Sequence, residues 1–329
     1  MTTSQAGRPG VSRRTLLRSS VAVAAAAATV GTPVSAAAGG TGAVADGERF
    51  DLTQPSYDLF RNVALHSATV LQGFAFNDVN GRLFTIQLTS GTGSTSGDLT
   101  VTQLSLTGQQ SGSMTLTGFG HGVSIAAQPV GSDTYLWTEK DANTNGYGAH
   151  LTRFRFVNGS TLDHGAASLP TYTPVAGGLE FTCSIDAQHD RMAVRYHTPA
   201  GKRIALFPLA DATAGTFSNT ILDIAQPDEL ASVTIQGYTL YGNYLYTLDG
   251  TAYSAANPDP GNTYVRAVDL GTGEVVQRFL TTAGGSLTYR EPEGMTVSVI
   301  QGEPRLYFGF ASQTGSPRLA NIFYKKAWI

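Results

Sequence analysis

The densest group of chemically active side chains lies at residues 289–294, which read Tyr-Arg-Glu-Pro-Glu-Gly. In an extended chain, alternate side chains point to the same side, so Glu291 and Glu293 would form a pair of carboxylates. Such a pair could hold sugar hydroxyls or act as the acid and the base of glycoside cleavage. Tyr289 and Arg290 would add a phenol and a cation. Alternatively, Arg290 could neutralise one carboxylate in a structural ion pair.

A second candidate is His121, which stands among glycines at residues 118–122, Gly-Phe-Gly-His-Gly. An imidazole can transfer protons near neutral pH. The same side chain could equally be a hydrogen-bonded residue of a channel wall. If the protein is an enzyme, the catalytic candidates are His121, Glu291 and Glu293. The sequence contains no Gly-x-Ser-x-Gly, His-Glu-x-x-His or phosphate-binding glycine loop, so several common hydrolase chemistries have no support.

A possible metal site lies at residues 141–146, Asp-Ala-Asn-Thr-Asn-Gly. Asp141, Asn143 and Asn145 place side-chain oxygens at alternate positions, as the first half of a calcium loop does. The position at which a bidentate Glu would complete the loop holds Thr152 instead, so calcium would need further ligands from elsewhere. Asn and Gly also suit an ordinary turn between strands. We therefore expect no cofactor, with calcium as the alternative.

A repeat predicts the elements that position these side chains. A segment that alternates apolar and small residues, followed by a turn and a second apolar segment, occurs five times. The copies begin at Gln72, His121, Phe181, Gln236 and Glu293. Their starts are 49, 60, 55 and 57 residues apart. With no helical periodicity between them, these intervals predict an all-β, five-bladed β-propeller. A β-sandwich or a β-helix is the alternative fold.

The fifth copy is short, because residues 293–329 hold only three predicted strands. Residues 46–70 have no other role in this scheme, so we predict that they supply the missing outer strand. Pairing the N-terminal strand with the C-terminal strand would close the ring and remove unpaired edges that invite aggregation. The predicted propeller therefore extends over residues 46–329.

The first positions of the five copies should be equivalent in space, at the start of the strand nearest the axis. Four of them are polar, and each of these four is followed by Gly, which permits close approach of a backbone or a ligand. Polar groups that converge on one mouth would make a binding funnel, although they could also cap the strands and hold channel waters. The expected ligand-binding residues are Gln72, His121, Gln236, Tyr289, Arg290 and Glu293.

The N-terminus predicts export. Residues 12–17, Ser-Arg-Arg-Thr-Leu-Leu, precede an apolar run at residues 21–30, which is shorter than the roughly 20 residues that span a bilayer. Residues 34–36, Val-Ser-Ala, fit a cleavage site, and no Cys follows to accept a lipid. We predict a twin-arginine signal peptide at residues 1–36 and a flexible linker at residues 37–45. The twin-arginine translocase would export a secreted protein without a membrane anchor, free or associated with the cell wall.

The composition fits a secreted protein. The chain has 38 Gly, only 14% charged residues and a formal net charge of −3. A mildly acidic protein offers no electrostatic footprint for nucleic acid or anionic lipid. Cys183 is the single cysteine, so no internal disulfide can form and folding depends on the hydrophobic core. We expect a monomer.

Several motifs in order carry a family resemblance. They are Gln-Gly-Phe-Ala-Phe at 72–76, Gly-Phe-Gly-His-Gly-Val-Ser at 118–124, Tyr-Leu-Trp-Thr-Glu at 135–139, Gln-Gly-Tyr at 236–238, Gly-Asn-Thr-Tyr-Val at 261–265 and the segment at 289–294. From about residue 71 onward, the chain resembles secreted proteins labelled "teichoic acid biosynthesis protein C". These share a propeller domain with the receptor-binding protein of a staphylococcal podovirus, a tail component that attaches to wall teichoic acid. Related proteins are called phage baseplate proteins. The resemblance implies the propeller, and it brings no established catalytic residues.

Three functions follow as hypotheses. The first is a binding module for a cell-envelope glycopolymer, either a teichoic-acid-like polyol phosphate or a polysaccharide, at the propeller mouth. The second is an exo-acting glycoside hydrolase or polysaccharide lyase on such a polymer, with His121 as base and Glu291 or Glu293 as acid. The third is a phage-tail-like structural or attachment protein. The residues leave open whether the protein is an enzyme.

Overall fold

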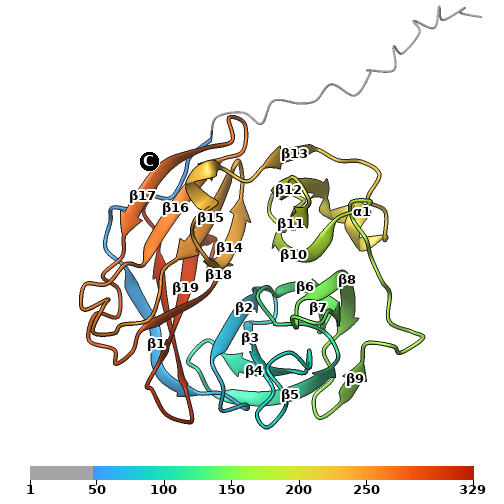
Figure 1. The fold of residues 1–329 in the computed structure, drawn as a ribbon, viewed down its shortest axis with the longest axis horizontal. Coiled ribbons are helices and arrows are strands. Elements are labelled where there is room, and N and C mark those ends of the chain that lie inside the picture. The colour runs from blue at the N-terminus through green and yellow to red at the C-terminus, as the bar shows by residue number, and fades with distance from the viewer. Residues whose placement is uncertain (1–46) are drawn as a thin grey trace, which may run out of the picture. The chain divides into compact units, whose positions relative to one another are not determined.

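The computed structural model describes residues 47–329, in which five β-sheets surround a central axis (Figure 1). The sequence predictions for the signal peptide and the linker concern residues outside this part. We number the sheets as blades 1 to 5 in the order of their innermost strands along the chain. The predicted five-bladed propeller is confirmed.

Each blade begins with the strand nearest the axis. Blade 1 contains β2 (Leu71–Asn77), β3 (Arg82–Leu88), β4 (Leu99–Ser105), β5 (Gln110–Thr117) and β9 (Thr161–Asp163). Blade 2 contains β6 (Ala126–Val130), β7 (Asp133–Ala142) and β8 (Gly148–Arg155). Short β9 pairs in parallel with β5. The chain therefore returns from blade 2 to blade 1 before it enters blade 3.

The third and fourth blades each have four strands. Blade 3 contains β10 (Leu179–Asp186), β11 (Arg191–Thr198), β12 (Gly201–Pro208) and β13 (Leu222–Ala225). A short helix α1 (Leu209–Thr213) joins β12 to β13, and a 3-10 turn (Asp228–Leu230) follows β13. Blade 4 contains β14 (Ile235–Tyr241), β15 (Tyr244–Asp249), β16 (Tyr264–Asp269) and β17 (Glu274–Leu280).

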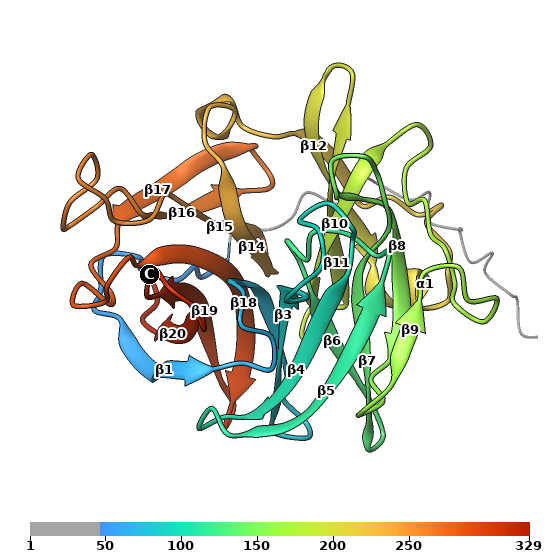
Figure 2. The ribbon, with the colours of Figure 1, turned by 60° about the horizontal axis from the view of Figure 1, so that its bottom comes forward.

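Both ends of the described chain meet in blade 5, whose strands are β18 (Glu291–Ile300), β19 (Glu303–Ser312), β20 (Leu319–Lys325) and β1 (Tyr57–Ala64). Figure 2 shows β1 beside β20, and the two strands pair antiparallel. The Phe50 ring also stacks on Trp328, with 4.1 Å between ring centroids. The N-terminal strand therefore closes the ring, as predicted.

The hydrophobic core is divided among the gaps between neighbouring blades. Five clusters of buried apolar side chains fill these gaps, one at each junction. At the junction of blades 1 and 5, Phe74 and Phe76 from β2 pack with Tyr307 from β19. Every sheet has two packed faces, so a strand such as β15 is buried at all its positions. Within residues 47–329, no helix is long and apolar enough to cross a membrane.

Candidate functional site at the two mouths of the ring

The axis has two mouths. We call the end at which the inner strands β2, β6, β10, β14 and β18 begin the start mouth, and the other the end mouth. Three glycine contacts bring the beginnings of four inner strands together. A Cβ on Gly237 would lie 2.5 Å from the carbonyl carbon of Gly294, one on Gly294 would lie 3.0 Å from the Cα of Gly73, and one on Gly73 would lie 3.3 Å from the carbonyl oxygen of Gly122.

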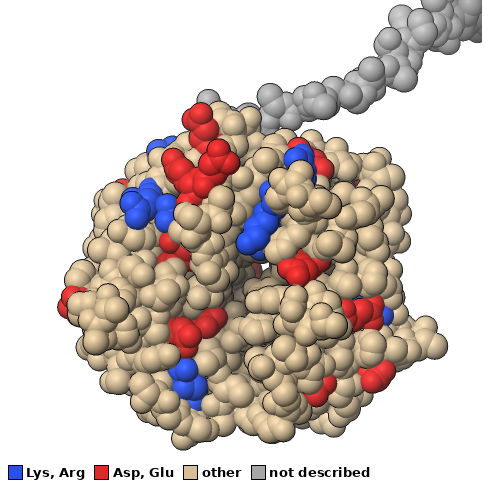
Figure 3. Space-filling model, viewed as in Figure 1, with Lys and Arg blue, Asp and Glu red and all other residues tan. Residues whose placement is uncertain are grey.

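These glycines follow the four polar repeat starts. They let neighbouring backbones approach closely, and at Gly237 and Gly294 a side chain would collide. The structure thus brings four of the predicted residues to the start mouth, namely Gln72, His121, Gln236 and Glu293. The fifth start, Phe181, is buried and stacks on Tyr196 in the core. Figure 3 shows the molecule along the axis, with charged side chains of both signs around a central hollow.

The two glutamines occupy equivalent irregular positions. Pairing of β2 with β3 shifts between Leu71 and Gly73, and pairing of β14 with β15 shifts between Ile235 and Gly237. The skipped residues are Gln72 and Gln236, because a β-bulge leaves one residue unpaired and re-aims its side chain. Both side chains are half-buried. Gln236 donates weakly to the Gly250 carbonyl at 3.4 Å, and within the described chain Gln72 makes no side-chain hydrogen bond.

His121 lies in the loop that leads into β6, half-buried. Its ring stacks on Tyr147, with 5.1 Å between centroids. Burial lowers the pKa of the imidazole, so the neutral form is favoured at neutral pH. Its Nδ1 is buried and finds no partner among residues 47–329. A neutral ring with an unused nitrogen can accept or donate one hydrogen bond to a ligand.

Glu139 on β7 fixes the His121 loop. Its Oε1 accepts the backbone N–H groups of His121, Gly122 and Val123 at 3.1, 2.7 and 3.2 Å, and its Oε2 accepts that of Gly148 at 2.6 Å. Burial raises the pKa of this carboxyl, and the four N–H groups oppose that shift. Sequence reasoning did not give Glu139 this role. The available signal was an acid shortly after the apolar and aromatic residues 135–137, Tyr-Leu-Trp, of the strand.

The two carboxylates at the start of β18 differ in their partners. Glu291 is paired with Arg318, which donates at 2.9 Å. Glu293 is only 6% exposed and has no side-chain hydrogen bond within the described part of the chain. Burial, and then the charge of nearby Glu291, raise its pKa well above the usual value. This proximity agrees with the expectation that both side chains share one side of the strand.

Arg290 differs from the sequence expectation. Its side chain is fully buried and donates to the Ala283 carbonyl, the Thr263 hydroxyl and the Thr281 carbonyl at 2.8, 3.2 and 2.8 Å. The expected alternative, an ion pair with a neighbouring Glu, is wrong, because these neutral oxygens take its N–H groups. Enclosure also argues against direct contact with a ligand. Neighbouring Tyr289 is half-buried against the guanidinium of Arg318, 4.6 Å from its ring centroid.

The candidate calcium loop forms a turn held by its own side chains. Asp141 accepts hydrogen bonds from His150 and His164 if their Nδ1 atoms carry protons, at 2.9 and 2.7 Å. The side-chain oxygen of Asn143 accepts the backbone N–H groups of Asn145 and Tyr147. Among residues 47–329, no group of three or more His, Cys, Asp or Glu side chains is arranged to hold a metal.

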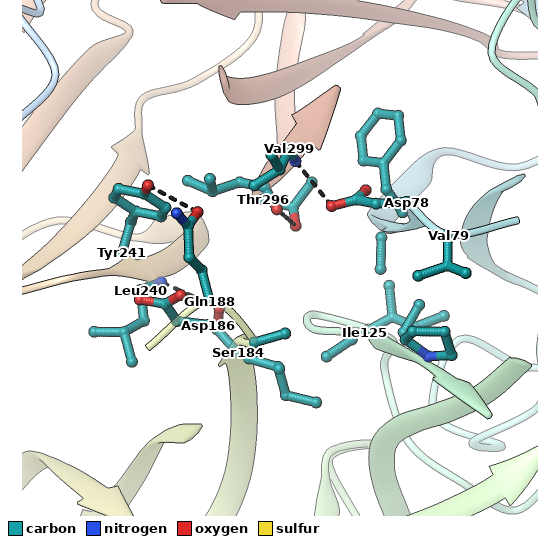
Figure 4. Close-up of a pocket in the computed structure, with 18 residues that line it drawn as sticks. Asp78, Val79, Ile125, Ser184, Asp186, Gln188, Leu240, Tyr241, Thr296 and Val299 are labelled. Carbon is teal, nitrogen blue, oxygen red and sulfur yellow. Dashed lines mark hydrogen bonds between the residues drawn. The ribbon is translucent and has the colours of Figure 1, made fainter. Parts of the chain in front are cut away.

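The end mouth holds a cavity of about 150 Å³, lined by residues from all five blades (Figure 4). Its polar side chains are engaged between blades. Asp78 accepts the Val299 N–H at 2.8 Å, Asp186 accepts the Gly242 N–H at 2.7 Å, and Gln188 accepts the Tyr241 hydroxyl at 3.0 Å. These groups join neighbouring blades, and most of the remaining wall is apolar.

The fold and the polar start mouth define a five-bladed propeller with a candidate binding surface at one end of its axis. Residues 70–324 match the family described as phage 5-bladed beta propeller receptor binding platform domain, and the chain belongs to this family.

The chain is 28% identical over 288 residues to the "Putative major teichoic acid biosynthesis protein C" of Bacillus subtilis (strain 168). The match covers 84% of this chain and 64% of that relative, so the chain spans less than two thirds of its length. The tail fiber of Staphylococcus aureus phage P68 has the same fold, with a TM-score of 0.69 and 18% identity over 84% of this chain and 54% of that one. An alpha-L-arabinofuranosidase from Lactobacillus brevis has a TM-score of 0.45 and 10% identity, over 79% of this chain and 92% of that one.

Proposed function

We propose that this propeller binds a cell-envelope glycopolymer, a teichoic-acid-like polyol phosphate or a polysaccharide, at its start mouth. The observation that carries the proposal is membership of a receptor-binding propeller family over residues 70–324. The name of the Bacillus subtilis relative points to teichoic acid as the polymer. The family description supports attachment to a surface polymer, whereas the name of the relative refers to the biosynthesis of that polymer.

The start mouth has the chemistry that such a ligand requires. Gln72 and Gln236 offer amides that are not consumed by strong internal hydrogen bonds. The stacked rings of His121 and Tyr147 offer a flat surface with a polar edge. Sugar and polyol hydroxyls are recognised by a few placed polar groups together with such surfaces.

Delivery to the envelope requires export, and we propose that residues 1–36 provide it through the twin-arginine translocase. Residues 1–45 fused to a folded reporter should carry it across the membrane, and Arg13→Lys with Arg14→Lys should stop it. Continued twin-arginine export of that double variant would contradict the proposal.

The binding proposal is tested with protein from which residues 1–36 have been removed. Its affinity should be measured for purified wall teichoic acid, synthetic poly(glycerol phosphate) and neutral envelope polysaccharides. We expect saturable binding to at least one of these polymers, with the polymer recovered intact. Absence of binding to all of them would contradict the proposal.

One observation favours a second candidate function, cleavage of the same polymer by a glycoside hydrolase or a lyase. The raised pKa of buried Glu293 is the property of a general acid, and His121 would be the base. If Glu293 transfers a proton, Glu293→Gln should lower turnover by about 10²–10⁴-fold while binding survives. Product analysis on the intact polymer distinguishes the candidates, because a binding module releases no fragments. A phage-tail-like structural role would retain attachment without turnover.

A further inference from the structure

Blade 3 carries a charged cluster at the start mouth, separate from the polar residues at the repeat starts. Arg195 and His197 alternate along β11, so they project from the same face of the sheet. Lys202 on β12 is the register partner of His197. Glu180 lies in the irregular stretch of β10 between Leu179 and Thr182. We call these four residues the blade 3 cluster.

The single carboxylate of the blade 3 cluster is already engaged. Glu180 lies 2.7 Å from Nδ1 of His197 and accepts the side-chain amide of Asn143 at 3.2 Å. Arg195 donates through its Nε to the side-chain oxygen of Gln226 at 2.8 Å. Within the described part of the chain, no carboxylate oxygen lies within 4.0 Å of a side-chain nitrogen of Arg195 or Lys202, so neither forms an ion pair.

The cluster therefore has more positive than negative charge in a half-buried place. Burial lowers the pKa of Lys202, and the neighbouring Arg195 lowers it further. Burial, followed by Arg195, likewise lowers the pKa of His197. Cations that repel one another while partly removed from water favour the arrival of an anion.

The cluster also lies where a polymer at the start mouth would pass. It belongs to the ends of β10, β11 and β12 at that mouth, beside blade 4, whose Tyr238 hydroxyl contacts the Thr182 hydroxyl at 3.1 Å. In Figure 3, a line of basic side chains runs to the central hollow over the junction of blades 3 and 4.

We propose that Arg195 and Lys202 form a binding site for the phosphodiester groups of a polyol-phosphate polymer, with His197 beside them. The planar guanidinium of Arg195 matches two phosphate oxygens, and Lys202 adds a point charge. Glu180 accepts the Nδ1–H of His197, so the Nε2 of the neutral ring is left to accept a hydrogen bond from a polyol hydroxyl next to the phosphate. This inference rests on the proposed function and narrows its ligand to a phosphate-bearing chain, because a neutral polysaccharide offers no partner for these cations.

The test compares two double variants with equal loss of charge. Arg195→Gln with Lys202→Gln removes the cations of the cluster, while Arg155→Gln with Lys326→Gln removes two cations elsewhere on the surface. Affinities for synthetic poly(glycerol phosphate) should be measured at low and moderate salt. We expect the cluster variant to bind at least tenfold more weakly and to lose most of the salt dependence, and the control variant to bind almost as wild type does.

Folding is checked by the melting temperature, and Arg195→Lys serves as a conservative variant that keeps the charge and should retain part of the affinity. If the wild type binds the polymer and the cluster variant binds equally well, the phosphate site is refuted and the proposed function survives. The phosphate site is also refuted if the wild type binds only neutral polysaccharides. If the wild type binds no polymer, the proposed function itself fails, and this inference fails with it.

Discussion

The two mouths of the ring are built from the same five inner strands and differ in what surrounds them. At the start mouth, the chain enters these strands through connections of six to fifteen residues. At the end mouth, it leaves them through turns of two or four residues. Polar groups at the end mouth, such as Asp78 and Asp186, are bonded across blades, whereas Gln72 and Glu293 at the start mouth have no such partners among the described residues.

This difference indicates that the end mouth stabilises the ring, whereas the start mouth is available for ligand binding. At the end mouth, short turns and hydrogen bonds between blades restrict which residues can be replaced without loss of stability. Long connections above a rigid scaffold are the usual place for binding residues. We therefore predict that changes at the end mouth alter stability and that changes at the start mouth alter binding.

The largest effect should come from removing the scaffold that both mouths share. Deletion of residues 46–70 removes β1 and exposes the edge of β20. An exposed edge strand invites association between molecules. We therefore expect the truncated protein to aggregate or to melt far below the wild type, as measured by light scattering and thermal unfolding. An unchanged monomer would show that β1 is dispensable.

The next effect concerns the glycines that bring the inner strands together. The Cβ of Gly237→Ala would meet the backbone of Gly294 at 2.5 Å, so the strands must separate. We expect a loss of about 1–3 kcal/mol in the free energy of unfolding. Gly315→Ala is the matched control, since its Cβ would meet nothing within 4 Å. Equal stability of the two variants would mean that close strand contact is not needed.

A smaller, pH-dependent effect is expected at Glu293. Its pKa is higher in the folded chain than the usual 4.5, so its contribution to stability is present below that value and is lost as the pH rises through the folded pKa. Glu293→Gln should therefore gain melting temperature relative to wild type as the pH rises above the usual value of 4.5 and through the folded pKa. Exposed Glu274→Gln should show no such trend. A pH-independent difference for Glu293→Gln would contradict the burial of this carboxyl.

The smallest effect on binding is expected at the end mouth. Asp78→Asn weakens the bonds to Ser298 and Val299 that join blades 1 and 5. We expect a stability loss of about 1 kcal/mol and no change in polymer affinity. Loss of affinity in a variant that remains folded would place the ligand at the end mouth and reverse the roles of the two mouths.

The repeat in the sequence was sufficient to predict the blades and the closing strand. The alternation within each strand and the interval between copies can both be read directly from the order of the residues. It was not sufficient for details that depend on cross-blade contacts. β9 pairs with blade 1 although the chain has already passed through blade 2. Nothing in the residues of such a short strand specifies that partner.

The candidate site was predicted less completely than the fold. The polar repeat starts do meet at one mouth. Arg290, however, donates to oxygens of Thr281 and Ala283 in its own connection and of Thr263 before β16. No pattern in the sequence predicts how this connection folds back on Arg290. The repeat predicts Phe181 as the start of the third copy, but Phe181 is buried, and Glu180, one residue earlier, carries the polar group. A β-bulge shifts the pattern by one residue and hides such a group from a repeat alignment.

An alanine scan of both mouths against one polymer that the wild type binds would show directly which mouth meets the ligand. Gln72→Ala, His121→Ala and Gln236→Ala represent the start mouth, and Gln188→Ala and Ser184→Ala represent the end mouth. We predict that each start-mouth variant loses about 0.5–1.5 kcal/mol of binding free energy, while the end-mouth variants bind as wild type does. Losses confined to Gln188→Ala and Ser184→Ala would contradict binding at the start mouth.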